Sequence, residues 1–234
     1  DPIEEISLVN AQLINGKYQI GDVVRVEVKS KEFGRIATQN AKNVILQKIR
    51  EEERKVIFDE YNSKEKDVVT GVVQRYVGKN VSINLGKADA LLTESEQIKG
   101  ETFQPTERIK VYILEVKNTP KGPRISVSRT HPELVKRLFE AEVTEIKDGT
   151  VEIMSIAREA GSRTKIAVRT NNPNVDAVGA CVGINGARVN AIVEELRGEK
   201  IDIVNWDENP GNFIQNALSP AKIVAVFADP DEKT

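Results

Sequence analysis

Two glycines separated by two residues stand directly before a predicted helix. They are Gly183 and Gly186, and the helix expected after them covers residues 187–197. Because glycine has no Cβ, the backbone of such a loop can approach a ligand closely, and the following helix offers N–H groups and the positive end of its dipole. This geometry suits the phosphates of a single-stranded nucleic acid. A tight turn between two helices would use the same glycines for its backbone alone.

Basic residues near this loop form a second group of candidates. Arg163, Lys165 and Arg169 alternate along one predicted strand, so they share a face on which a nucleic-acid backbone can lie. Arg158 belongs to the preceding strand, and Arg188 lies just inside the helix that follows the glycines. The solvent-facing side of an ordinary β-hairpin would show the same pattern.

The elements around the loop alternate in type. Apolar periodicity predicts the order helix, strand, strand, helix, helix, strand between residues 132 and 206. Proline at position 132 fits the first turn of a helix, and Gly198 ends the helix after the loop. The helices are expected over 132–143, 174–182 and 187–197, and the strands over 149–158, 163–169 and 200–206.

The preceding segment, residues 67–129, has the sequence pattern of an all-β domain. Five short strand-like runs separated by turn residues fit a small closed or partly open barrel. The OB-fold is a barrel of this size that binds oligonucleotides through the face of its second and third strands. The runs cover residues 67–76, 79–86, 88–93, 108–117 and 123–129.

Both ends of the chain carry further elements. Alternation of Val24, Val26 and Val28 with charged residues predicts a half-buried strand, and a long amphipathic helix is expected from Gly34 to about residue 61. After residue 207, a helix over 209–220 and a strand over 221–228 are expected. We therefore predict an α+β multidomain chain, which we interpret as a piece of something larger because it begins with Asp1.

Composition limits the classes of function. The 234 residues are 39% apolar and 30% charged, and the net charge of −2 argues against a strongly basic nucleic-acid binder unless the charges are segregated. No apolar run approaches the roughly 20 residues of a membrane helix. The single cysteine, Cys181, excludes an internal disulfide and fits the cytoplasm.

An enzyme would need chemistry that this sequence does not offer. The only histidine, His131, precedes a proline and has no nearby nucleophile pattern, and Cys181 lies among small apolar residues. No metal-ligand spacing is visible, and the glycine loop lacks the lysine of a nucleotide-binding loop. We therefore expect no catalysis, no metal and no cofactor.

Long phrases of the sequence resemble the bacterial NusA family of transcription factors. They are "SRTHPELVKRLFEAEV", "DGTVEIMSIAREAGSRTKIAV", "NNPNVDAVGACVGINGARVNAIVEELRGEKIDIVNW" and "NALSPAKI". The resemblance implies that a five-stranded OB-fold barrel of the S1 type, at 67–130, is followed by a first KH domain of type II, at 132–206. It further implies that residues 1–62 end a polymerase-binding N-terminal domain with its connecting helix, and that 207–234 begin a truncated second KH domain.

The resemblance also implies a function. The implied protein is a non-catalytic elongation factor that binds RNA polymerase and nascent single-stranded RNA. It modulates pausing, termination and antitermination, and other Nus antitermination factors are further implied partners. We expect a cytoplasmic monomer. The RNA-binding residues that it implies are Gly183, Ile184, Asn185, Gly186 and Arg188 in the loop region, Arg163, Lys165 and Arg169 in the KH sheet, and Arg75, Tyr76, Lys87 and Arg124 on the S1 domain.

Several positions depart from the family pattern. Asn185 stands where the family commonly has a basic residue, so one phosphate-neutralising charge is missing. Asn80 and Thr93 stand where S1 domains often carry stacking aromatics and a histidine. Only Tyr76 and Arg124 resemble the RNA-binding residues usual in S1 domains. Because stacking contributes about 1–3 kcal/mol per base, we expect weak, mainly electrostatic contact at the S1 face, with Lys79 and Lys121 contributing.

Two other classes of function remain open at this point. The long helix could make the chain a protein-binding adaptor that never touches RNA. The chain could also be an RNA-binding module of the translation or RNA-decay machinery, such as the tail of polynucleotide phosphorylase. That tail joins the same two domain types in the reverse order, KH before S1.

Overall fold

The computed structural model describes residues 5–25, 34–120 and 122–227, and it divides into two compact units, Asp1–Arg50 and Glu51–Thr234. The first unit contains α1 (Leu8–Ile14), whose N-cap Ser7 accepts a hydrogen bond from the Asn10 N–H. The sequence did not predict this helix. The prediction of a strand around Val24 is wrong for residues 22–25, which form no regular structure. Val26 and Val28, which belong to the same prediction, lie outside the described residues. An isolated strand without a neighbour has no ladder to stabilise it.

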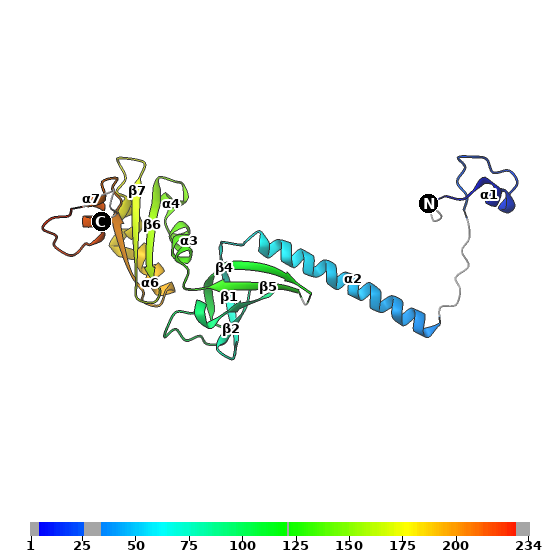
Figure 1. The fold of residues 1–234 in the computed structure, drawn as a ribbon, viewed down its shortest axis with the longest axis horizontal. Coiled ribbons are helices and arrows are strands. Elements are labelled where there is room, and N and C mark those ends of the chain that lie inside the picture. The colour runs from blue at the N-terminus through cyan, green and yellow to red at the C-terminus, as the bar shows by residue number, and fades with distance from the viewer. Residues whose placement is uncertain (1–4, 26–33, 121, 228–234) are drawn as a thin grey trace. The chain divides into compact units, whose positions relative to one another are not determined.

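The predicted long helix is confirmed as α2 (Arg35–Asn62), a single uninterrupted rod (Figure 1). Its last turns belong to the second unit and pack on the barrel. Tyr61 is buried there and donates its hydroxyl hydrogen to the Leu85 carbonyl at 2.9 Å, while Arg54 donates to the Pro120 carbonyl at 2.9 Å. These contacts fix the end of the helix to the barrel.

The five predicted strands form a closed barrel in the order β1-β2-β3-β5-β4. Neighbouring strands are antiparallel except for β3 and β5, which run parallel. Alternate residues such as Val81 and Ile83 point inward and fill the interior, as a small barrel requires. The strands are β1 (Val68–Val77), β2 (Asn80–Asn84), β3 (Asp89–Leu92), β4 (Arg108–Thr119) and β5 (Gly122–Ser128), with a 3-10 turn η1 (Glu94–Glu96) after β3.

A three-stranded sheet with helices follows the barrel, in the predicted element order plus one short helix, α4, that the sequence did not indicate. The sheet order is β6-β7-β8, with β6 and β7 antiparallel and β7 and β8 parallel. Ile166 and Val168 of β7 pack with residues of the helices, such as Phe139 and Ile192, in one core. The elements are α3 (Pro132–Glu142), α4 (Thr144–Lys147), β6 (Val151–Glu159), β7 (Arg163–Thr170), α5 (Ala177–Val182), η2 (Ile184–Gly186), α6 (Ala187–Glu195) and β8 (Lys200–Asn205).

The last described element is α7 (Pro210–Ala217), which confirms the helix expected there. It lies on the side of the sheet opposite to α3 (Figure 1). The strand expected over 221–228 is wrong for residues 221–227, which are irregular, and residue 228 lies outside the described residues. Val224 and Phe227 are exposed, and no described strand pairs with this segment, so nothing holds it extended.

A buried arginine joins the barrel to the following domain. The Arg129 guanidinium pairs with Glu101 of the barrel at 2.5 Å and with Glu195 of α6 at 3.3 Å, and it donates to the carbonyls of Lys110 and Glu195. Its side chain is fully buried. Tyr112 of β4 adds an apolar contact by stacking on His131 with ring centres 4.7 Å apart.

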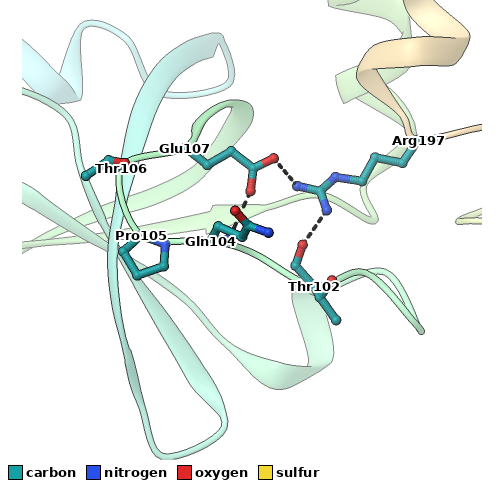
Figure 2. A pocket seen from close by; sticks show the side chains of 6 residues that line it. All are labelled: Thr102, Gln104, Pro105, Thr106, Glu107 and Arg197. Atoms are coloured by element: carbon teal, nitrogen blue, oxygen red, sulfur yellow. Dashed lines mark hydrogen bonds and ion pairs between the residues drawn. The ribbon is translucent and has the colours of Figure 1, made fainter.

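Arg197, just after α6, completes this joint from the solvent side. Figure 2 shows its guanidinium pointing at Glu107 and Thr102 of the barrel. It pairs with Glu107 at 2.7 Å, donates to the Thr102 carbonyl and lies over the Phe103 ring. An open polar hollow of about 470 Å³ lies here, lined by Thr102, Gln104, Pro105, Thr106, Glu107 and Arg197.

A second buried ion pair lies inside the domain that contains the three-stranded sheet. Arg158 and Glu199 have fully buried side chains and make two hydrogen bonds of 2.9 Å. Glu199 also accepts from Thr164 and from the Gly161 N–H. Burial alone would raise the pKa of Glu199, but the hydrogen bonds from Arg158, Thr164 and Gly161 outweigh it and lower the pKa below its ordinary value of 4.5.

We predict that Arg129→Ala lowers the free energy of unfolding by about 3–5 kcal/mol, because it removes the buried cation that pairs with both Glu101 and Glu195 and leaves the buried Glu101 carboxylate with only the partly exposed Arg197 as a partner. Urea unfolding at neutral pH measures this. Arg137→Ala is the control, because its ion pair with Glu140 is partly exposed and contributes at most about 1 kcal/mol. Equal losses in the two variants would contradict a special role for Arg129.

We predict that Glu199→Gln flattens the dependence of stability on pH below 4.5. Because the folded-state pKa is depressed, the stabilisation by Glu199 is complete above 4.5 and is lost as the pH falls through the folded-state pKa. Urea midpoints measured from neutral pH into this acid range test the prediction. The exposed Glu159→Gln serves as control and should follow the wild type, whereas parallel profiles for Glu199→Gln and the wild type would refute the prediction.

Candidate nucleic-acid interface

The glycine loop is a left-handed turn between α5 and α6. Gly183 caps α5 with φ 75°, Asn185 has φ 52°, and Gly186 caps the start of α6 with φ 77°. Side chains other than asparagine and aspartate rarely adopt such angles, so both glycines are required by the backbone itself. The turn closes with a hydrogen bond of 3.1 Å from the Gly186 N–H to the Gly183 carbonyl.

The bare sides of the two glycines face protein atoms. A Cβ on Gly183 would lie 2.8 Å from Cγ of Arg188, and one on Gly186 would lie 3.2 Å from Nδ2 of Asn190. The glycines are therefore needed for the tight turn between the two helices, which was the alternative to a ligand-binding role. The tip of the loop nevertheless projects outward, because Ile184 is 87% exposed and Asn185 is exposed.

The start of α6 is open to an anionic ligand. Its N-cap is Gly186, which has no side chain to accept hydrogen bonds from the first turn. The helix is nine residues long, so its dipole adds positive potential at the loop. The N–H groups of Gly186 and Ala187 already bond to the carbonyls of Gly183 and Ile184. The exposed Asn185 amide, next to the positive end of the helix dipole, is thus the donor that the loop tip can offer to a phosphate.

A cavity of about 560 Å³ adjoins the loop. Arg188 stands at its edge, where it donates to the Ala180 carbonyl at 2.6 Å and pairs with Glu145 of α4 at 2.8 Å. Behind it, burial above all raises the pKa of the Cys181 thiol to about 11. The cavity is lined by Glu145, Gly179, Ala180, Gly183, Ile184, Ala187 and Arg188.

The predicted row on β7 lies on one face of its strand, because Thr164, Ile166 and Val168 are buried on the other. Each cation of the row has an acidic partner. Arg163 and Lys165 lie 3.4 Å and 3.7 Å from Asp202, and Arg169 lies 3.0 Å from Glu152.

Lys165 and Arg169 also make contacts that hold neighbouring segments in place. Lys165 donates to the carbonyls of Ala217 and Ser219, so it fixes the end of α7. The Arg169 guanidinium lies over the Trp206 ring at 5.2 Å. Arg158, which the sequence placed beside this row, is in the buried pair with Glu199 and is not on the surface.

The candidates on the barrel are spread over several elements. Arg75 and Tyr76 lie on β1, where Tyr76 is 46% exposed and its hydroxyl accepts from the Phe103 N–H, and Arg124 is exposed on β5. Among the described residues, Arg75 and Arg124 have no ion-pair partner. Lys87 pairs with Glu60 at 2.8 Å and Lys79 with Glu94 at 2.9 Å, while Lys121 lies outside the described residues.

Sequence reasoning missed a polar network on the outer face of β1, β2 and β3. Gln74 donates to Asp89 at 3.0 Å and accepts from Ser82 at 3.0 Å, and Asn84 donates to Asp89 at 2.9 Å. Polar residues at alternating positions 82 and 84 were the available signal. The network makes this face a set of amides around a carboxylate rather than a cationic surface.

Two properties of the described residues bear on other classes of function. Within them, no cluster of three or more histidine, cysteine, aspartate or glutamate side chains could hold a metal ion. In the same part of the chain, no helix has both the length and the apolar content needed to span a membrane.

Family models match three adjoining parts of the chain. Residues 1–55 match the NusA N-terminal domain, residues 63–128 the S1 RNA binding domain, and residues 129–206 the NusA-like first KH domain. The barrel is therefore an S1 domain, and the sheet with its helices is a KH domain.

Curated relatives align with nearly the whole chain. The transcription termination/antitermination protein NusA of Bacillus subtilis is 57% identical over 229 residues, which are 98% of this chain and 62% of that protein. Its counterpart in Halalkalibacterium halodurans is 54% identical (98% of this chain, 60% of that protein), and that of Thermus thermophilus is 44% identical (100% and 60%). The chain thus spans about 60% of the length of these relatives. With three adjoining domain matches and 57% identity to a relative over 98% of its length, the chain belongs to the NusA family.

Proposed function

We propose that this chain is part of a non-catalytic RNA-binding factor that modulates transcriptional pausing, termination and antitermination. The relatives are named transcription termination/antitermination proteins, and two of the matched domain types bind RNA in other proteins. The observation that carries the proposal is the exposed left-handed loop Gly183–Gly186 at the uncapped start of α6.

In this proposal the loop tip holds RNA phosphates. The side-chain amide of Asn185 donates to a phosphate, and the positive end of the α6 dipole attracts it, with Arg188 close behind. Because the loop backbone is held by the hydrogen bond from Gly186 to Gly183 before binding, little backbone entropy is lost when a phosphate docks. Asn185 is neutral, so the loop contributes few released counterions and binds RNA with modest affinity.

The remaining predicted RNA-binding residues differ in whether their charge is already paired with a carboxylate. Arg75 and Arg124 are exposed and have no ion-pair partner among the described residues, and the ring of Tyr76 is half exposed for stacking. Arg163, Lys165, Arg169 and Lys87 would each have to share or release a carboxylate. We propose that these four contribute less than their number suggests.

RNA polymerase is the proposed protein partner, through residues 1–62, and other Nus factors are further candidates. Exposed apolar side chains in that region, such as Val9 and Leu13 of α1, support a protein-binding role. The segment 207–234 is proposed as the start of a second KH domain, which would cover the exposed Leu218, Val224 and Phe227. We further propose that the protein is a monomer and acts in the cytoplasm.

The chemistry of the candidate catalytic residues supports a non-enzymatic role. The raised pKa of Cys181 keeps its thiol protonated at neutral pH, so it is a poor nucleophile. His131 stacks on Tyr112, and its Nδ1 accepts a hydrogen bond from the Glu133 N–H at the start of α3. Both residues thus have structural roles.

We predict that Asn185→Asp weakens binding of a short A-rich single-stranded RNA about fivefold or more at low salt, because a carboxylate at the loop tip repels phosphates. Fluorescence anisotropy of labelled RNA with the 234-residue chain measures the affinity. The backbone angle at this position suits aspartate as well as asparagine, so the fold should be unaffected.

Asn174→Asp is the matched control. It makes the same change of charge on an exposed residue before α5, at the end of that helix away from the loop. The control should bind nearly as the wild type does. Equal binding by both variants would remove the loop from the RNA interface, and absence of any RNA binding by the wild type would favour a protein-binding adaptor.

A further inference from the structure

Arg188 is the cation closest to the glycine loop, and its charge is shared with a carboxylate. Nη1 of Arg188 lies 2.8 Å from Oε2 of Glu145 and 2.6 Å from the Ala180 carbonyl oxygen. The two ionised side chains are each about one-third exposed. Water and a ligand can therefore reach the pair, unlike the fully buried pair of Arg158 and Glu199.

The position of Arg188 is set by its stem as well as by its charge. Its aliphatic carbons lie against the bare side of Gly183, where a Cβ would approach Cγ to 2.8 Å and Cδ to 3.1 Å. The Ala180 carbonyl belongs to α5 and accepts a hydrogen bond from the same nitrogen, Nη1, that pairs with Glu145. Loss of the Glu145 charge would thus leave Arg188 beside the loop.

The guanidinium keeps donors for a ligand. Nε and Nη2 have no hydrogen-bond partner among the described residues, and neither is a buried unsatisfied atom. Arg188, Glu145 and the exposed Ile184 line the same cavity of about 560 Å³. A phosphate that docks at the loop would meet both the cation and its acidic partner.

We infer that Glu145 is an affinity-determining residue that competes with RNA phosphate for Arg188. This inference rests on the proposed RNA binding at the loop. In the free protein the carboxylate occupies Arg188, and a docking phosphate must displace it or share the guanidinium. Glu145 thereby lowers the affinity of the loop and limits the number of counterions that RNA binding releases.

The size of the effect follows from the exposure of the pair. A partly exposed ion pair is weak, so its loss should change the RNA affinity by about two- to fivefold rather than by orders of magnitude. One further phosphate contact on a single strand should steepen the dependence of log K on log salt by about 0.7. The steeper slope separates a freed cation from a general change in stability.

The test compares Glu145→Gln with the wild-type 234-residue chain. Binding of short A-rich single-stranded RNA is measured by fluorescence anisotropy at several salt concentrations. Glu145→Gln should bind about two- to fivefold more tightly at low salt and should show the steeper slope. Adding Arg188→Gln to this variant should abolish both gains. Arg188→Gln in the wild-type background should change the RNA affinity and the salt slope less than it does in the Glu145→Gln background.

Glu140→Gln is the matched control, because it removes the carboxylate of another partly exposed arginine pair in the same domain, Arg137–Glu140. It should leave the salt slope unchanged. If Glu145→Gln behaves like Glu140→Gln while Asn185→Asp still weakens binding, the inference is wrong and the proposed function stands. If Asn185→Asp has no effect or the wild type binds no RNA, the proposed function fails and the inference fails with it.

Discussion

The left-handed backbone of the loop between α5 and α6 is the constraint on which the candidate interface depends. Three of its four residues have positive φ, which places the chain reversal exactly where one helix ends and the next begins. Glycine at positions 183 and 186 makes this conformation possible without strain. The same glycines admit the stem of Arg188 and the side chain of Asn190 to the inner side of the turn. Exposure of Ile184 and Asn185 is the consequence on the outer side.

Charge pairing is the second feature that shapes this chain. Five of the seven basic candidates have a carboxylate within 4 Å, namely Lys87, Arg163, Lys165, Arg169 and Arg188. Such pairs are weak in water, so a polyanion can compete for the cation, but it must do so at each contact. For the proposed interface, this pairing favours adjustable binding over tight binding. Arg75 and Arg124 differ in having no such partner among the described residues.

Two arginine side chains connect the S1 and KH domains by pairing with residues across the boundary between them. Arg129 follows the last barrel strand and is neutralised by Glu101 of the barrel and Glu195 of α6. Arg197 adds a second contact from α6 to the barrel loop that carries Glu107 (Figure 2). A buried guanidinium tolerates few alternative geometries, because any shift leaves a charge without its partner. The joint thus couples the position of the glycine loop to that of the barrel.

The sequence by itself determined the order and type of nearly all elements in the second unit, because their apolar periodicity is local and strong. It also determined the glycine loop, since positive φ restricts the residue type directly. It could not exclude a strand around Val24 or after residue 221, because strands form only with partners that lie elsewhere. Tertiary structure alone decided which cations a ligand can reach: Arg158 and Arg163 look alike in sequence, yet the first is buried against Glu199, whereas the second is exposed beside Asp202. The partner of Arg188 is 43 residues away, and only folding brings Glu145 to the loop.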